Sequence, residues 1–196
     1  MTEILLVDCH PDDWKNRVPH YLRVLNAAGR VSITVDYRSV SASFTLPGFH
    51  AAVITGSPMM LSESEPPDNL AAFVQGLSCP VLGICYGHQL LGRLSGAPVH
   101  SGERIERKER IRQLRPSPLF EGLGPEFEML ESHREYLDRA AIEGCGWELL
   151  AQSDSCPVEA MRHTVKPWFG VQFHPERSDE PGAVLVRNFV GLVGPV

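Results

Sequence analysis

The first half of the chain alternates between strand-like runs and segments with helical spacing, and this alternation constrains the fold more than any other feature. The strand-like runs are mostly continuous and apolar, as in strands buried on both faces, and they lie at residues 4–7, 31–35, 51–55 and 80–84. Apolar residues recur at helical spacing at 18–25, 70–77 and 89–94. Strands that alternate with helices form βαβ units. We therefore expect an α/β fold with an open, mostly parallel sheet and flanking helices.

The second half of the chain is richer in strand-like and turn-rich segments. We expect strands at residues 99–115, 127–130, 147–150, 158–161 and 168–173, followed by an apolar helix at 183–192. The run from 103 to 115 mixes both signs of charge and predicts a solvated strand pair. No repeat or linker separates the two halves. We therefore expect a small β-rich excursion within a single domain that spans residues 1–196, a length usual for one domain.

Charge and cysteine content exclude several classes of protein. The 18 Lys and Arg against 24 Asp and Glu give a net charge of −6, which is no reason to expect nucleic-acid binding. No apolar run reaches the roughly 20 residues of a membrane span, and the N-terminus lacks the cationic start of a signal peptide. Five scattered cysteines without CxxC spacing predict a reduced, cytoplasmic protein. We expect no metal site and no cofactor.

One cysteine, Cys85, lies where a strand is expected to turn sharply into a helix. Gly83 and Gly87 flank it at the spacing of the nucleophile elbow of hydrolases, where the crowded backbone requires small residues. The start of the following helix places partial positive charge and free N–H groups beside the sulfur, which favours the thiolate. Cys85 is therefore our candidate nucleophile.

A thiol nucleophile needs a base, and the base needs a group that orients it. The segment His174-Pro175-Glu176 follows the last expected strand, and catalytic sites of open α/β sheets gather at the carboxyl ends of strands. We expect His174 to take the thiol proton and Glu176 to hold the imidazole ring.

The motifs GICYGHQ and GVQFHPE together resemble the class I, or triad-type, glutamine amidotransferases, over essentially the whole chain. The resemblance implies a flavodoxin-like three-layer fold. It also implies hydrolysis of the side-chain amide of L-glutamine through a γ-glutamyl thioester on Cys85. His174 is then the general base and acid, and Glu176 is the third member of the triad. Such proteins pass ammonia to a synthetase.

A tetrahedral intermediate needs two N–H donors for its oxyanion. The amide of Tyr86, directly after the nucleophile, is the first candidate. The second is the amide of Ser57, in the loop after the strand at 51–55, where Gly56 supplies flexibility. The family usually has glycine where Ser57 stands.

Further substrate contacts follow from the resemblance alone. Gln89 matches the family glutamine that contacts the amino-acid end of the substrate. Ser132 and His133 match a segment whose backbone holds glutamine, although Arg134 replaces the glycine of that segment.

Within the family, the segments SCPVEAMRH and GVQFHPE are most similar to the glutaminase part of GMP synthase. The length leaves no room for an ATP-pyrophosphatase domain, so we expect the ammonia-accepting synthetase to be a separate polypeptide. Two alternatives stay open: a γ-glutamyl hydrolase or peptidase on the same scaffold, and a catalytically silent regulatory subunit.

Overall fold

The computed structural model describes residues 3–46 and 48–193 of the chain. The strands are β1 (Glu3–Asp8), β2 (Val31–Asp36), β3 (Phe49–Ile54), β4 (Val81–Ile84), β5 (Val99–Gln113), β6 (Glu126–Leu137), β7 (Trp147–Gln152), β8 (Ala160–His163) and β9 (Trp168–Val171). The α-helices are α1 (Val18–Ala27), α2 (Asp68–Gln75), α3 (Tyr86–Leu94), α4 (Arg139–Ile142) and α5 (Asp179–Gly191). All the strands belong to one sheet, in the order β2-β1-β3-β4-β9-β8-β7-β5-β6.

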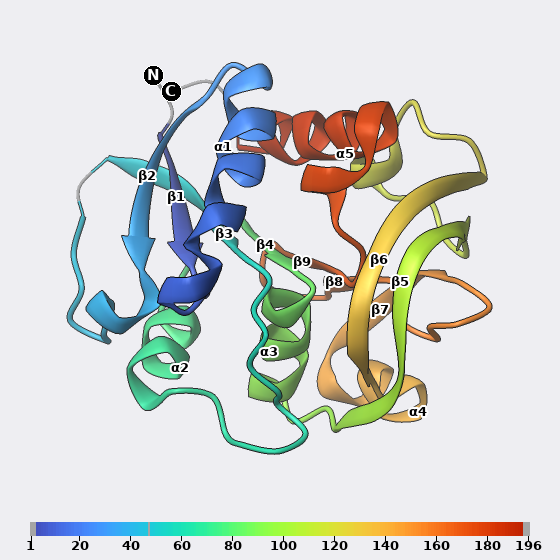
Figure 1. Ribbon diagram of the computed structural model, residues 1–196, viewed down its shortest axis with the longest axis horizontal. Coiled ribbons are helices and arrows are strands. Elements are labelled where there is room, and N and C mark those ends of the chain that lie inside the picture. The colour runs from blue at the N-terminus through green and yellow to red at the C-terminus, as the bar shows by residue number, and fades with distance from the viewer. Residues whose placement is uncertain (1–2, 47, 194–196) are drawn as a thin grey trace.

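The sheet is parallel through its first five strands and antiparallel through the rest. Helices α1 and α5 cover one face, and α2 and α3 cover the other (Figure 1). This arrangement confirms the predicted α/β fold and its three layers. The pairing of β4 with β9 decides where the site lies, because it places the residues that follow each strand side by side.

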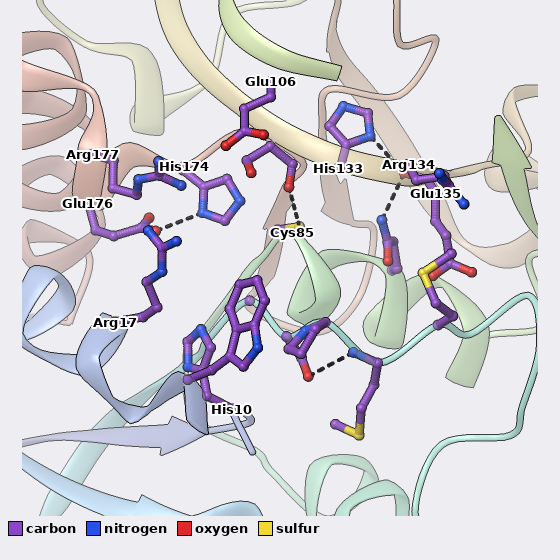
Figure 2. Close-up of a pocket in the computed structure, with 18 of the residues that line it drawn as sticks. His10, Arg17, Cys85, Glu106, His133, Arg134, Glu135, His174, Glu176 and Arg177 are labelled. Carbon is purple, nitrogen blue, oxygen red and sulfur yellow. Dashed lines mark hydrogen bonds and ion pairs between the residues drawn. The ribbon is translucent and has the colours of Figure 1, made fainter. Parts of the chain in front are cut away.

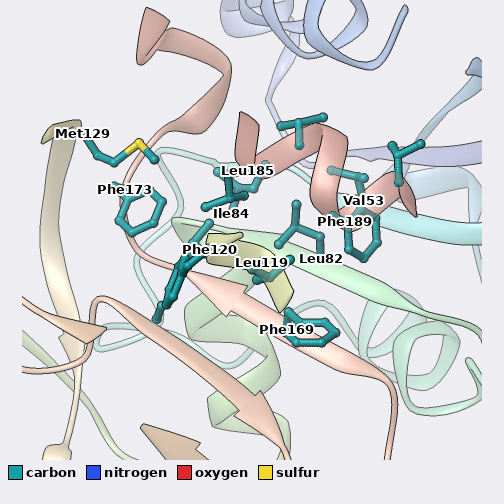
Figure 3. Close-up of a cluster of buried hydrophobic side chains, with 14 of the residues drawn as sticks. Val53, Leu82, Ile84, Leu119, Phe120, Met129, Phe169, Phe173, Leu185 and Phe189 are labelled. Atoms are coloured by element: carbon teal, nitrogen blue, oxygen red, sulfur yellow. The ribbon is translucent and has the colours of Figure 1, made fainter. Parts of the chain in front are cut away.

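Each face of the parallel part carries its own apolar core. Ile4 and Leu6 of β1 pack under α1 and α5, while Leu5 and Val7 pack toward α2 and α3. Neighbouring residues of a strand point to opposite faces, so a strand covered on both sides must be apolar throughout. Figure 3 shows the first core, in which Phe189 of α5 lies over the sheet.

The charged run at 103–115 forms one strand, not the strand pair that we predicted. β5 extends from Val99 to Gln113 and pairs with β6 along its length. The physical reason is that residues 103–113 contain no turn-forming glycine or proline. Alternate side chains on one face of the strand pair with each other instead, as Arg107 does with Glu109 at 2.6 Å.

The last helix begins at Asp179, four residues before the predicted start at 183. Pro181 does not prevent this, because a proline in the first turn of a helix lacks only an N–H group that has no partner in the helix. Among the described residues, no helix is both long enough and apolar enough to cross a membrane.

Candidate active site

Cys85 occupies a strained backbone position between β4 and α3. Its φ of 51° and ψ of −104° are a conformation that a side chain disfavours. The flanking glycines make the turn possible. A Cβ atom on Gly83 would lie 2.5 Å from the backbone of Gly87, and one on Gly87 would overlap the carbonyl oxygen of Ile54. The predicted elbow is therefore present, and its two glycines are required by close backbone contacts.

The strain at this position predicts a measurable effect on stability. Glycine adopts positive φ at no steric cost, although it loses more chain entropy on folding than alanine does. Because the relief of strain exceeds this entropic cost, Cys85→Gly should be more stable than Cys85→Ala by about 1 kcal/mol. Urea denaturation of the two variants measures the difference. A less stable glycine variant would contradict the assignment of strain to this residue.

His174 and Glu176 follow β9 and lie beside Cys85. Nδ1 of His174 is 2.7 Å from Oε1 of Glu176, and both side chains are buried. The backbone N–H of His174 donates to the carbonyl oxygen of Leu130 on β6, at 2.8 Å. Figure 2 shows the His174 ring between the Glu176 carboxylate and Cys85. The structure thus brings the three predicted triad residues together from two neighbouring parallel strands.

The charges of this group favour an ion pair. Burial by itself would lower the pKa of His174, but the negative charges of Glu176 and Cys85 outweigh it and raise that pKa well above its usual value. Burial would also raise the pKa of Glu176, but the charge and hydrogen bond of His174 hold that pKa below its usual value. A stabilised imidazolium is what a thiolate nucleophile needs beside it.

The loop after β3 lies against this pair. A Cβ atom on Gly56 would be 3.2 Å from Cε1 of His174 and 3.6 Å from Cβ of Cys85. The N–H group of Gly56 donates to the hydroxyl of Tyr21 at 3.0 Å. The side chain of Ser57 anchors the loop, because its Oγ donates to the carbonyl oxygen of Cys9 at 2.8 Å. The amide of Gly56 is therefore engaged, which leaves that of Ser57 as the candidate donor from this loop.

Tyr86 and Gln89 lie on α3. Tyr86 is the first residue of the helix, where N–H groups have no partner within the helix, and its side chain is buried. Nε2 of Gln89 donates to the carbonyl oxygen of Glu135 at 2.9 Å and to Oε1 of Gln172 at 3.0 Å. These bonds fix the amide of Gln89.

Strand β6 forms the opposite wall of the site. Sγ of Cys85 lies 4.0 Å from the carbonyl oxygen of Ser132. The next residue, His133, points inward, and its Nδ1 lies 2.9 Å from the carbonyl oxygen of Glu135. Arg134 is exposed, so the replacement of the family glycine places no side chain in the core, but Arg134 borders the cavity of the site.

A cavity of about 320 Å³ opens above Cys85, within the usual size range of small-molecule sites. Eight of the nine predicted site residues line it: Gly56, Ser57, Cys85, Gln89, Ser132, His133, His174 and Glu176. The ninth, Tyr86, directly follows Cys85 in the chain and is buried. In the described part of the chain, no group of three or more His, Cys, Asp or Glu side chains is arranged to hold a metal ion.

Sequence reasoning missed three residues that hold the site together. Tyr21 of α1 accepts the N–H of Gly56 and lies near Glu176, and Arg23 of the same helix donates to the carbonyl oxygen of Glu176 at 3.0 Å. The carboxylate of Glu135 accepts two backbone N–H groups of the loop after β3, at 2.9 and 2.6 Å. The sequence marks Tyr21 only as an apolar helix position and carries no signal for Arg23. Glu135 stands at the acidic end of the segment that contains Ser132 and His133, and only that resemblance pointed to it.

Comparison with known proteins decides the family. The model of the family described as glutamine amidotransferase class-I matches residues 5–192, nearly the whole chain. The chain belongs to the class I glutamine amidotransferases. Membership confirms the resemblance seen in the two motifs and makes the protein a glutamine-hydrolysing cysteine amidohydrolase.

Two relatives that the chain matches are named as a subunit of GMP synthase. The chain is 35% identical over 144 residues to the glutamine-hydrolysing GMP synthase subunit of Pyrococcus furiosus. The aligned residues cover 72% of this chain and 74% of that protein. It is 44% identical over 117 residues to the same subunit of Thermococcus kodakarensis. The aligned residues cover 59% of this chain and 61% of that protein, so this match spans less than two thirds of the length of that relative.

Solved structures agree with this placement. A protein of Thermoplasma acidophilum, described as a GMP synthase subunit, has a TM-score of 0.84 and 25% identity, with 98% of this chain and 94% of that chain covered. A glutamine amidotransferase of Thermotoga maritima has a TM-score of 0.75 and 15% identity, with 98% of each chain covered, and shares the fold.

Proposed function

We propose that Cys85 attacks the side-chain amide carbon of glutamine, with His174 and Glu176 completing the triad. His174 holds the thiol proton and delivers it to the departing ammonia, which leaves a γ-glutamyl thioester on Cys85. A water molecule, deprotonated by His174, then attacks the thioester and releases glutamate. The observation that carries this proposal is that His174 and Glu176 are buried, that Nδ1 of His174 lies 2.7 Å from Oε1 of Glu176, and that both residues line the same cavity as Cys85.

The oxyanion of each tetrahedral intermediate is held by the amides of Tyr86 and Ser57 in this proposal. Two such donors contribute most when they are fixed before the reaction begins. Support comes from the helix start at Tyr86 and from the anchored side chain of Ser57. Gln89, together with the backbone of Ser132 and His133, borders the space for the amino-acid end of glutamine.

The ammonia is passed to a separate synthetase of the GMP synthase type. The relatives named as one subunit of GMP synthase support this proposal, because that name implies a second subunit. The experiment is ammonia release from glutamine, with and without the synthetase subunit of an archaeal GMP synthase, its nucleotide substrate and ATP. We expect the partner to increase glutamine turnover and GMP to form. Glutamine turnover without GMP formation would support glutamine hydrolysis but contradict the transfer of ammonia to this synthetase.

An electrophilic glutamine analogue tests the site directly. The analogue should label Cys85, and peptide mapping by mass spectrometry identifies the residue. Labelling of another cysteine would contradict the triad, and no labelling at all would favour a silent regulatory subunit. Faster turnover of γ-glutamyl dipeptides than of glutamine would favour the γ-glutamyl hydrolase alternative.

Tyr21 should position the triad and the loop after β3 together. Its hydroxyl accepts the N–H of Gly56, so its own proton is free for Glu176, whose Oε2 has no hydrogen-bond partner among the described residues. Tyr21→Phe should lower kcat for glutamine about tenfold, the effect of roughly one lost hydrogen bond.

Steady-state kinetics of Tyr21→Phe measure this effect, and Tyr136→Phe is the matched control. The Tyr136 ring packs near His100, away from the cavity, so removal of the Tyr136 hydroxyl should leave kcat unchanged. Equal kcat values in the wild type and Tyr21→Phe would remove Tyr21 from the positioning machinery.

A further inference from the structure

Two fully buried carboxylates, Glu131 and Glu159, lie behind the active site and play no part in the triad. Each side chain has no solvent exposure, and none of their carboxylate oxygen atoms has a hydrogen-bond partner among the described residues. Glu131 lies on β6, next to Ser132. Glu159 precedes β8, and its carbonyl oxygen accepts the N–H of Gln172 at 2.8 Å. The two carboxyl groups are close enough for each to shift the pKa of the other, and the side chain of Ser153 also lies beside Glu159.

His133 adds a third group to this cluster. Its Nδ1 lies 2.9 Å from the carbonyl oxygen of Glu135, which can only accept, so Nδ1 carries a proton. Burial lowers the pKa of His133, which favours the neutral ring and leaves Nε2 as an acceptor. This atom lies 3.2 Å from Oε2 of Glu131. Acceptors therefore face each other at both ends of Glu131.

Facing acceptors in a dry interior are unstable unless protons lie between them. A proton on Glu159 can be donated to Glu131, and a proton between Glu131 and His133 joins that pair. The two protons thus join the three side chains into a chain of hydrogen bonds. Burial raises the pKa values of both glutamates, and the charge of Glu131 raises that of Glu159 further, which keeps these protons bound near neutral pH.

We propose that Glu159, Glu131 and His133 form a proton-sharing relay that positions strand β6 against Cys85 and His174. The relay joins β6 to the segment before β8, and that segment is bonded to the chain leading to His174. Ser132, whose carbonyl oxygen lies 4.0 Å from Sγ of Cys85, stands between two members of the relay. The three residues are positioning residues, and their effect on catalysis rests on the function proposed above.

Other titratable groups surround the relay and influence the pH at which it loses protons. The positive charge of His174 acts on Glu131, and Glu109 of β5 acts on Glu131 and His133. His88 of α3 lies near His133, but burial lowers its pKa to about 3, so it stays neutral. The thiol of Cys156 lies near both glutamates, and burial raises its pKa. Above neutral pH the glutamates of the relay lose protons, and the imidazolium of His174, whose pKa is also raised, loses its proton as well.

The sign of the pH effect follows from the raised pKa values. In the unfolded chain both glutamates ionise near pH 4.5, whereas the folded relay keeps its protons to higher pH. The stability from the relay is fully present below the unfolded pKa and is lost as the pH rises through the folded values. Loss of the proton between the glutamates places two negative charges side by side and separates β6 from the triad.

The test uses Glu159→Gln and Glu159→Leu in the full chain. Gln keeps a donor toward Glu131 without a proton that titrates, whereas Leu removes the donor. We expect the alkaline limb of kcat/KM for glutamine to move to higher pH in Glu159→Gln. We expect a loss of at least tenfold at every pH in Glu159→Leu. Superimposable pH profiles for the wild type and Glu159→Gln would overturn the proposal.

Two further measurements do not depend on glutamine hydrolysis. Difference infrared spectra should show a protonated carboxyl group in the wild type at pH 7 that is lost in Glu159→Gln. The pH dependence of urea denaturation should show about one more proton released on unfolding by the wild type than by this variant, near neutral pH. Two ionised carboxylates in the spectra would overturn the relay. A relay present in a chain that does not hydrolyse glutamine would overturn only the proposed function.

Discussion

Replacing Cys85 with alanine is expected to lower ammonia release from glutamine by about 10⁴-fold or more, since a triad without its nucleophile retains only residual activity. The fold should survive the change. Cys85 contributes one small side chain to the core, and the turn is held by backbone contacts of Gly83 and Gly87. Ammonia release and urea denaturation of the same preparation measure both outcomes.

The matched control is Cys79→Ala. Cys79 is partly buried at the margin of the core under α2 and α3 and does not line the cavity. The control variant should retain full activity and incorporate the glutamine analogue on Cys85. Undiminished ammonia release by Cys85→Ala, measured after removal of contaminating glutaminase, would contradict the assignment of the nucleophile.

Activity should also be sensitive to substitution of a glycine that is far from Cys85 in sequence. Gly182, in the first turns of α5, lies directly on the turn that carries His174 and Glu176. A Cβ atom there would overlap the carbonyl oxygen of Pro175 and lie 2.8 Å from its carbonyl carbon. Backbone atoms cannot rotate away as a side chain can. Either the helix or the triad turn must therefore move.

Gly182→Ala should consequently destabilise the protein by about 1–3 kcal/mol, the usual cost of overpacking. It should also lower kcat for glutamine about 100-fold, because displacement of a reacting group by about 1 Å costs that much. Denaturation curves and steady-state kinetics measure the two effects. Because partial unfolding also reduces activity, kcat is compared at a temperature where the variant is fully folded by circular dichroism.

Gly191→Ala, at the other end of the same helix, is the control. Among the described residues, no atom beyond the chain neighbours and the helix's own backbone lies within 4 Å of a Cβ placed there, so alanine fits and adds helix propensity of at most about 1 kcal/mol. The control should be at least as stable as the wild type and fully active. If Gly182→Ala had the same stability and kcat as Gly191→Ala, the close contact between α5 and the triad turn would not be needed for stability or catalysis.

The parts of the site that the sequence predicted are those encoded by a few neighbouring residues. The elbow at Cys85 is a local pattern of strand, glycines and helix start. His174 and Glu176 are two residues apart, so the chain itself brings them together. The strands were predicted for a similar reason: a sheet covered on both faces demands continuous apolar runs, which are visible without any tertiary information.

The charged strand β5 shows where this reasoning fails. The mixture of positive and negative charges along 103–115 indicates exposure, but it does not say which strand will be the partner. That choice depends on β6, which follows β5 after the segment 114–125 and contributes the inward-facing residues of the site wall. Pairing between segments separated in sequence is set by the whole sheet.

The sequence by itself predicted the fold class, the resemblance to the family and the positions of the candidate triad, because each rests on short runs or motifs whose residues are close together in the chain. The tertiary structure alone decided which contacts surround that triad: Tyr21 on Gly56, Arg23 on the carbonyl oxygen of Glu176, and Gly182 against Pro175. These are ordinary residue types in ordinary local sequences. Their roles arise from contacts between distant segments, and such contacts exist only after the sheet has assembled and the helices have packed on it.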